Sequence, residues 1–96
     1  ETMKVGEMEL TFLHTPGHTP GGMSIHVDKH IFSGDTLFCM TAGRTDLYGG
    51  NEEMMIESLK KLIALDGDYR VLPGHNRETT LERERTRNWY IRRMVK

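Results

Sequence analysis

The chain has 96 residues, a formal net charge of -1 and one cysteine, and 36% of its residues are hydrophobic. The near-neutral charge gives no overall attraction to nucleic acid or anionic lipid, and a single cysteine excludes an internal disulfide framework while it fits a reducing cytosol. No apolar run reaches the roughly 20 residues that a membrane-spanning helix needs. We therefore expect one cytoplasmic unit, residues 1–96, with neither nucleic acid nor a membrane as a partner.

Three strands are predicted in the first part of the chain. Residues 7–13 alternate polar and apolar side chains, as a half-buried strand does, and run into a glycine-rich turn. Residues 23–27 alternate again, and residues 28–29 form the predicted turn of a hairpin whose second strand is 30–33. Asp35 therefore follows the end of the third strand.

A loop rich in small and polar residues is predicted from Asp35 to Gly50. Asn51 is the predicted N-cap of a helix, because two acidic residues follow it and complement the positive end of the helix dipole. Apolar residues then recur at helical spacing up to Leu65. One face of this helix should pack on the sheet.

The last third of the chain predicts one more strand and one more helix. Residues 69–72 form the strand, and His75 follows its end. Thr79 is the predicted N-cap of a terminal helix, in a capping box with Glu82, and apolar residues continue to Val95. The order β-β-β-α-β-α predicts an α+β fold in which an antiparallel-rich sheet carries helices on one face.

Three motifs place possible metal ligands in glycine-rich turns at strand ends. They are His-Thr-Pro-Gly-His-Thr-Pro-Gly at 14–21, Ser-Gly-Asp at 33–35 and Pro-Gly-His at 73–75. Imidazole nitrogens suit Zn²⁺ and Fe²⁺, a carboxylate can bridge two cations, and glycine permits tight turns. Taken singly, a histidine in a turn is more often a hydrogen-bonded ring, and an aspartate often caps a turn. The ordered set of three predicts a metal site.

This ordered set resembles the second half of the metallo-β-lactamase superfamily and is most similar to its glyoxalase II-like branch of thioester hydrolases. The resemblance covers nearly the whole chain and implies half of an αββα sandwich. It also implies that His18 ligates one metal ion, that His75 ligates a second, and that Asp35 bridges the two and acts in catalysis. The implied cofactor is Zn²⁺, two per complete site, with Fe²⁺ as the alternative.

The first half of that superfamily carries a His-x-His-x-Asp-His motif, and this chain contains no such motif. We therefore expect an incomplete fragment, inactive alone, that needs a missing N-terminal half or associates with itself. Such a half would expose the face that its partner covers.

The resemblance implies a hydrolase in which a hydroxide held by two metal ions attacks the carbonyl of a small-molecule thioester or related ester. Two alternatives stay open. One is a persulfide dioxygenase-like oxidoreductase with one non-haem iron, although Ala42 stands where those relatives tend to carry a cysteine. The other is a non-catalytic half that binds another chain.

The run Gly43-Arg44-Thr45-Asp46 recurs in the glyoxalase-like and persulfide dioxygenase-like branches of the superfamily. We expect Arg44 and Asp46 to brace the loop beside the metals through hydrogen bonds. Tyr48 in the following loop could face a substrate.

Other conspicuous residues are assigned no functional role. His14 could support the ligand turn or could simply pack at a strand end, and His26 and His30 receive no role. Cys39 is predicted to be a small buried hydrophobe. The basic residues of 83–96 are interrupted by Glu82 and Glu84, which predicts a solvated helix face.

Overall fold

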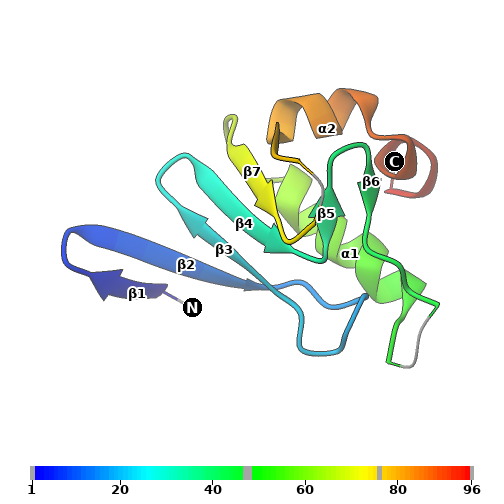
Figure 1. Cartoon of the computed structure of the whole chain (residues 1–96), viewed down its shortest axis with the longest axis horizontal. Helices are drawn as coiled ribbons and strands as arrows, with labels where there is room; N and C mark the ends of the chain where they lie inside the picture. Colours follow the sequence, from blue (N-terminus) through cyan, green and yellow to red (C-terminus); the bar gives the residue numbers. More distant parts are fainter. Residues whose placement is uncertain (1, 47–48, 76, 96) are drawn as a thin grey trace.

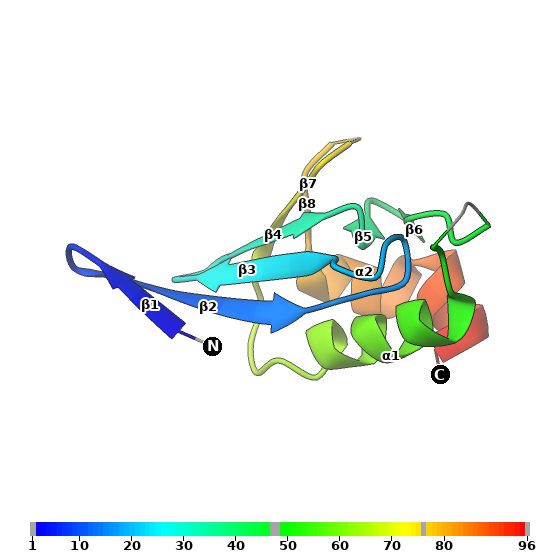
Figure 2. The ribbon, with the colours of Figure 1, turned by 90° about the horizontal axis from the view of Figure 1, so that it is seen from below.

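The structure is a computed structural model that describes residues 2–46, 49–75 and 77–95. Six strands form the main sheet in the order β1-β2-β3-β4-β7-β8, and the helices lie on one of its faces (Figures 1 and 2). The strands are β1 (Thr2–Val5), β2 (Met8–His14), β3 (Met23–Val27), β4 (His30–Gly34), β5 (Leu37–Phe38), β6 (Thr41–Ala42), β7 (Arg70–Pro73) and β8 (Thr79–Thr80). The helices are α1 (Glu52–Ile63), α2 (Leu81–Arg87) and the π-helix η1 (Ile91–Val95).

The neighbouring strands of this sheet are antiparallel except for β4 and β7, which run parallel. The expected α+β fold with an antiparallel-rich sheet is therefore confirmed. β3 is antiparallel to both β2 and β4, and β7 is parallel to β4. The strands β2, β4 and β7 therefore point in the same direction. Their carboxyl ends meet at one edge of the sheet, where the three predicted ligand turns follow them.

The core lies between the sheet and the helices. Side chains alternate across a strand, so Ile31 of β4 and Val71 of β7 point toward the helices, and both are fully buried. Apolar residues at helical spacing on α1 pack into this core from the helix side, as predicted. The remaining buried apolar residues are Leu37, Met55, Leu59, Leu62, Leu81, Ile91 and Val95. Full burial of one such side chain stabilises the fold by about 1.5–3 kcal/mol.

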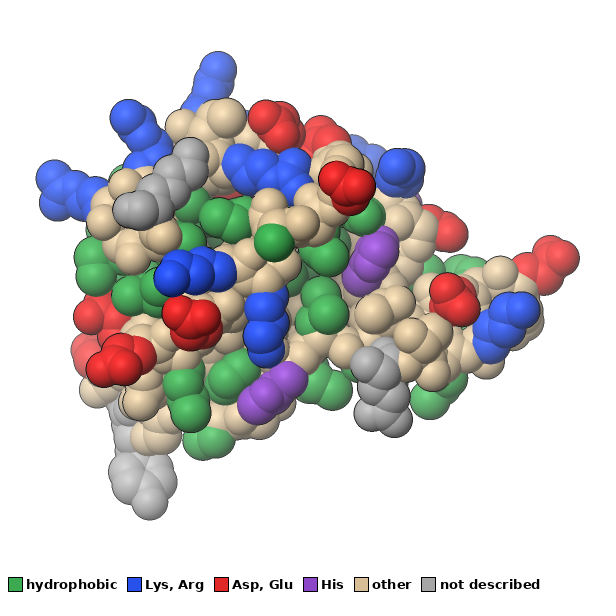
Figure 3. Space-filling view, turned by 180° about the vertical axis from the view of Figure 1, so that it is seen from behind, with side chains coloured by type: hydrophobic (Ala, Val, Ile, Leu, Met, Phe, Trp, Pro, Cys, Tyr) green, Lys and Arg blue, Asp and Glu red, His purple; other side chains and the backbone are tan. Residues whose placement is uncertain are grey.

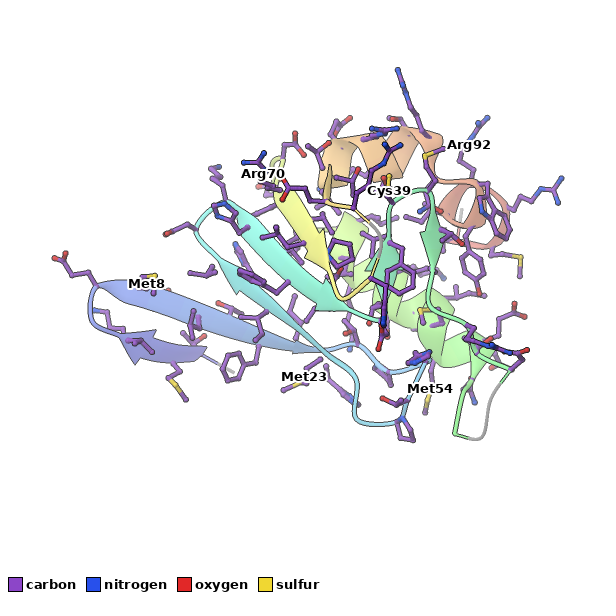
Figure 4. All side chains as sticks on the ribbon, in the orientation of Figure 1. Met8, Met23, Cys39, Met54, Arg70 and Arg92 are labelled. Atoms are coloured by element: carbon purple, nitrogen blue, oxygen red, sulfur yellow. The ribbon has the colours of Figure 1, made fainter. Side chains whose placement is uncertain are left out.

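The opposite face of the sheet is largely apolar, and none of the described helices covers it (Figure 2). Met8, Met23 and Phe32 lie on three neighbouring strands of this face, and they are 48%, 46% and 46% exposed. Figure 4 labels the two methionines on β2 and β3. A hollow of about 450 Å³ lies over the same face, with Val27 and Leu72 in its lining. The apolar face expected of a half-sandwich is therefore present.

The segment after Asp35 differs from the predicted loop. Strands β5 and β6 pair antiparallel in a short hairpin, and the Gly43 N–H closes its base on the Thr36 carbonyl at 3.0 Å. Each strand has two residues. Alternation cannot be recognised over so short a stretch, so the sequence pattern did not predict this hairpin.

Two other short strands were not predicted. β1 pairs with β2 through a turn at Gly6, which has φ 63°, and all of β1 is exposed. β8 is a two-residue strand beside β7. Both add strands at the edges of the predicted sheet.

The start of the terminal helix was predicted one residue too early. Thr80 is the N-cap of α2, since its hydroxyl oxygen accepts the Arg83 N–H at 3.2 Å. Thr79 instead belongs to β8 and is buried, and its hydroxyl donates to Glu84. Two adjacent threonines offer the same capping chemistry, and burial decided between them. By contrast, the predicted cap Asn51 is confirmed, because its side chain accepts the Met54 N–H at 2.9 Å.

The single terminal helix predicted to reach Val95 is also wrong. α2 ends at Arg87, and Asn88 adopts extended dihedrals before the chain turns into η1. Figure 3 shows the helix-bearing side, where both Lys or Arg and acidic side chains lie at the surface. Glu84, however, is fully buried and takes no part in that surface. None of the described helices is long and apolar enough to cross a bilayer.

Arg85 joins the two main helices. Its guanidinium donates to the carbonyl of Ile63, the last residue of α1, and to those of Leu65 and Gly67 in the segment that follows. We predict that Arg85→Met lowers the free energy of unfolding by about 1–3 kcal/mol, because three backbone carbonyls lose their charged donor. Urea denaturation measures the change. Arg87→Met, on an exposed position of the same helix, should stay within about 0.5 kcal/mol of wild type, and equal losses would contradict this role.

Candidate metal centre

The turn that carries His18 is held tightly against α1. The Asn51 N–H donates to the Gly17 carbonyl at 2.7 Å, and the Ser58 hydroxyl donates to the Pro16 carbonyl at 2.6 Å. Asn51 is also the N-cap of the helix, so the helix start and the turn share one residue. The position of His18 therefore depends on α1 as well as on β2.

One ring nitrogen of His18 is fixed by the backbone. Its Nδ1 lies 2.8 Å from the Arg44 carbonyl oxygen. Because a carbonyl only accepts, Nδ1 must carry the hydrogen, and Nε2 of the neutral ring keeps its lone pair. Nε2 faces Asp35 Oδ2 at 3.7 Å. A histidine that binds metal needs this arrangement, in which the second nitrogen is held by a partner.

Asp35 lies between the two predicted histidine ligands. Its Oδ1 accepts from His75 Nδ1 at 2.9 Å, while Oδ2 faces His18. The side chains of His18, Asp35 and His75 are 27%, 39% and 76% exposed, so the group opens toward solvent on the His75 side. The structure thus brings together the three residues that the motifs singled out.

Two features shape the space around these side chains. A hollow of about 270 Å³ adjoins them and has His18, Asp35, Met23 and Thr36 in its wall. Gly43 lies against Asp35 and His18. A Cβ atom added to it would collide with the Asp35 carbonyl oxygen and would lie 3.4 Å from the His18 Cβ. Glycine is therefore required where the chain returns from the β5–β6 hairpin.

Arg44 and Asp46 form the hydrogen-bonded pair that was expected. Arg44 Nε donates to one Asp46 carboxylate oxygen at 2.8 Å and Nη2 donates to the other at 3.1 Å. These bonds raise the pKa of Arg44 and lower the pKa of Asp46. The pair is exposed, and its role in bracing the loop stays a prediction. Tyr48 lies outside the described residues.

The donor set fits Zn²⁺ or Fe²⁺ but forms only part of a coordination sphere. Imidazole and carboxylate are ligands of both ions in proteins. Among the residues that the structure describes, no group of three or more His, Cys, Asp or Glu side chains is arranged to hold an ion by itself. His18 and His75 lie on opposite sides of the Asp35 carboxylate and each contacts one of its two oxygens.

The other histidines and the cysteine lie apart from this group. His14 supports the ligand turn, because its Nε2 lies 2.9 Å from the Pro20 carbonyl oxygen. His26 packs edge-on against the Tyr69 ring at 4.7 Å. Cys39 is half-buried in the β5–β6 turn rather than buried as predicted. The Arg44 carbonyl, which orients His18, had no signal in the sequence, since every residue has a carbonyl.

A comparison with protein families identifies the group to which this chain is related. The model described as metallo-beta-lactamase superfamily matches residues 1–75. The chain belongs to this superfamily. Its members bind metal ions, and the fold expected from the motifs matches a part of solved structures of this superfamily.

Curated relatives extend well beyond this chain. The probable metallo-hydrolase YqgX of Bacillus subtilis is 40% identical over 92 residues, which cover 93% of this chain and 44% of the relative. The hydroxyacylglutathione hydrolase GloC of Haemophilus influenzae is 38% identical over 94 residues, which cover 95% of this chain and 44% of the relative. The chain thus spans less than half the length of these superfamily members.

Solved structures show the same coverage. ETHE1 from Myxococcus xanthus superposes with a TM-score of 0.89 at 31% identity, over 95% of this chain and 43% of that one. TTHA1623, solved in a di-iron-bound form, has a TM-score of 0.81 at 38% identity, over 92% of this chain and 44% of that one. The fold of this chain is therefore shared with proteins of about twice its length.

The close contact between Gly43 and the Asp35 backbone can be tested with two matched substitutions. Gly43→Ala should lower the free energy of unfolding by at least about 1–3 kcal/mol, because the added methyl group collides with the backbone at Asp35. Gly21→Ala, where nothing lies within 4 Å, should leave stability within about 0.5 kcal/mol of wild type. Thermal unfolding of both variants measures the difference. A harmless Gly43→Ala would contradict the described packing.

The Arg44–Asp46 pair predicts a pH response with a definite sign. The hydrogen bonds from Arg44 hold the pKa of Asp46 below its ordinary value of 3.8. The pair is therefore intact above that pH and is lost only as the pH falls further. A carbon-13 NMR titration of the Asp46 carboxyl should show a midpoint below 3.8, and Arg44→Gln should move it upward. An unchanged midpoint in that variant would rule out Arg44 as the cause.

Proposed function

We propose that this chain is the C-terminal half of a metal-dependent hydrolase of the glyoxalase II-like type, which cleaves a small-molecule thioester or related ester. The observation that carries the proposal is the position of Asp35 between His18 and His75. The similarity to a relative named hydroxyacylglutathione hydrolase favours a thioester substrate.

In the proposed site His18 would ligate one ion, His75 a second, and Asp35 both. The proposed ions are zinc, and when bound they would acidify a water molecule and polarise the ester carbonyl. The Arg44 carbonyl would keep the proton of His18 on Nδ1, so that Nε2 stays available as a ligand. Arg44 and Asp46 would hold the loop that supplies this carbonyl. No side chain of this half would need to act as a nucleophile.

The proposal includes a second half that completes both the site and the sandwich. Three observations support it. The chain spans about 44% of the length of its relatives, its sheet exposes an apolar face at Met8, Met23 and Phe32, and the described residues hold no complete ligand cage. A partner that brings its own apolar face and a His-x-His-x-Asp-His motif would satisfy all three. The free Cys39 fits a reducing, cytoplasmic setting for this assembly.

Iron is the second candidate metal. The observation that favours it is the di-iron-bound form of a structural neighbour that is 38% identical to this chain. A persulfide dioxygenase-like oxidoreductase with one iron would use His18 and Asp35 together with a histidine from the other half. Metal content and substrate class separate this alternative from the hydrolase.

The test joins this chain to an N-terminal half that carries the His-x-His-x-Asp-His motif in one polypeptide. We expect about two zinc ions per polypeptide by elemental mass spectrometry, thioester hydrolysis by thiol release, and less metal in the 96-residue chain alone. Asp35→Ala should at least halve the metal content and lower kcat/KM by at least about 100-fold, since both ions lose a ligand.

The control is His26→Gln, because His26 packs against Tyr69 outside the site, and its metal content should match wild type. Full hydrolysis by metal-free Asp35→Ala would refute the proposal. One iron per polypeptide without thioester hydrolysis would replace it with the oxidoreductase.

A further inference from the structure

Glu84 is a buried carboxylate that the proposed function does not use. Its side chain is fully buried, yet three donors surround it. Oε1 accepts the Met40 N–H at 2.8 Å and the Asn88 side-chain amide at 2.7 Å, and Oε2 accepts the Thr79 hydroxyl at 2.8 Å. A carboxylate is retained in a core only where such bonds offset its desolvation, so its contacts indicate what it holds in place.

Two of these contacts reach the tip of the β5–β6 hairpin. Met40 has φ 71°, a left-handed conformation that is rare for a residue with a side chain, and its N–H points at Glu84. Asn88 is also fully buried, and its amide reaches the carbonyls of Thr41 at 3.1 Å and Phe38 at 3.5 Å. Two buried side chains thus hold three backbone groups of one turn. In Figure 4 the label of Cys39 marks this tip beside α2.

The base of the same hairpin carries the candidate metal centre. The chain enters it directly after Asp35 and leaves it at Gly43, which lies against the Asp35 carbonyl and His18. The next residue, Arg44, supplies the carbonyl that orients the His18 ring. A shift of the hairpin would therefore move two of the three predicted ligands.

Glu84 also contacts the segment that follows the third ligand. Thr79 lies four residues after His75, in β8, and donates to the same carboxylate that holds Met40. The Phe38 ring of the hairpin meets the His75 ring edge-on at 6.1 Å. One carboxylate therefore ties together the two chain segments that begin at Asp35 and His75.

We propose that Glu84, assisted by Asn88, is a positioning residue for the metal centre. It locks the hairpin tip and the β8 strand in one arrangement, and so sets the spacing of His18, Asp35 and His75 without contact with any of them. This inference rests on the proposed function, because it assumes that these three residues bind metal. The hydrogen bonds to this carboxylate are directional. A carboxylate with three aligned donors permits one placement of the β5–β6 turn, whereas an apolar side chain would permit several.

Arg85 provides a matched control on the same helix. It also anchors α2 through hydrogen bonds, but its acceptors lie at and just after the end of α1 and not in the hairpin. A substitution there should weaken the fold while the ligand spacing is preserved. Glu84→Gln is the conservative variant, because its amide oxygen can accept from Met40 and Asn88 while its NH₂ group donates to the Thr79 hydroxyl.

The experiment measures zinc affinity by chelator competition in the polypeptide that joins this chain to the complementing half. Glu84→Ala should raise the zinc Kd at least about tenfold and alter the visible spectrum of the cobalt-substituted protein. Glu84→Gln should restore both to near wild type. Arg85→Met should lower Tm in the metal-free protein by as much as Glu84→Ala does, yet leave the zinc Kd within threefold.

Equal losses of zinc affinity in Glu84→Ala and Arg85→Met would overturn the inference, because Glu84 would then act through stability alone. If Glu84→Ala does not fold, Thr79→Val decides, since it removes only the bond from β8 to Oε2. A threefold or larger rise in its zinc Kd supports the inference, and an unchanged Kd overturns it. A wild-type polypeptide that binds no metal would instead refute the proposed function, so the two failures are distinguishable.

Discussion

The parallel pairing of β4 with β7 is the constraint on which the candidate site depends. Gly34 pairs with Pro73, and the Gly74 N–H donates to the Gly34 carbonyl at 2.7 Å. Asp35 directly follows Gly34, and His75 directly follows Gly74, so a carboxylate and an imidazole leave the sheet side by side. This pair joins residues 40 positions apart. Had β7 run antiparallel to β4, His75 would lie at the far end of the sheet.

The side chains of the predicted ligands are positioned mainly by backbone groups and by residues outside the candidate site. A carbonyl orients the His18 ring, a glycine permits the return of the hairpin, and buried Glu84 and Asn88 hold the tip of that hairpin. Protein interiors are packed too densely to deform gradually, so such supports define a small number of arrangements. The geometry of the candidate site therefore depends on the helices that pack on the sheet.

The helices bury one face of the sheet and leave its other, apolar face exposed, and the chain spans less than half the length of the superfamily members it matches. Chains of this size bury only about two-thirds of their unfolded surface and are marginally stable alone. Here α1, α2 and η1 complete one core, while the other sheet face keeps its Met and Phe side chains exposed. In the proposed function, a second half would cover this exposed face.

Periodicity and motif spacing by themselves determined the α+β class, the central strands, α1 with its Asn51 cap, and the candidates His18, Asp35 and His75. These features depend on local alternation, on cap chemistry and on glycine-rich turns, all of which are visible within a few neighbouring residues. Tertiary structure decided the β5–β6 hairpin, the choice of Thr80 over Thr79 as a cap, the break at Asn88 and the burial of Glu84. Each of these depends on contacts between residues distant in the chain, such as the bond from Met40 to Glu84, for which a local pattern carries no signal.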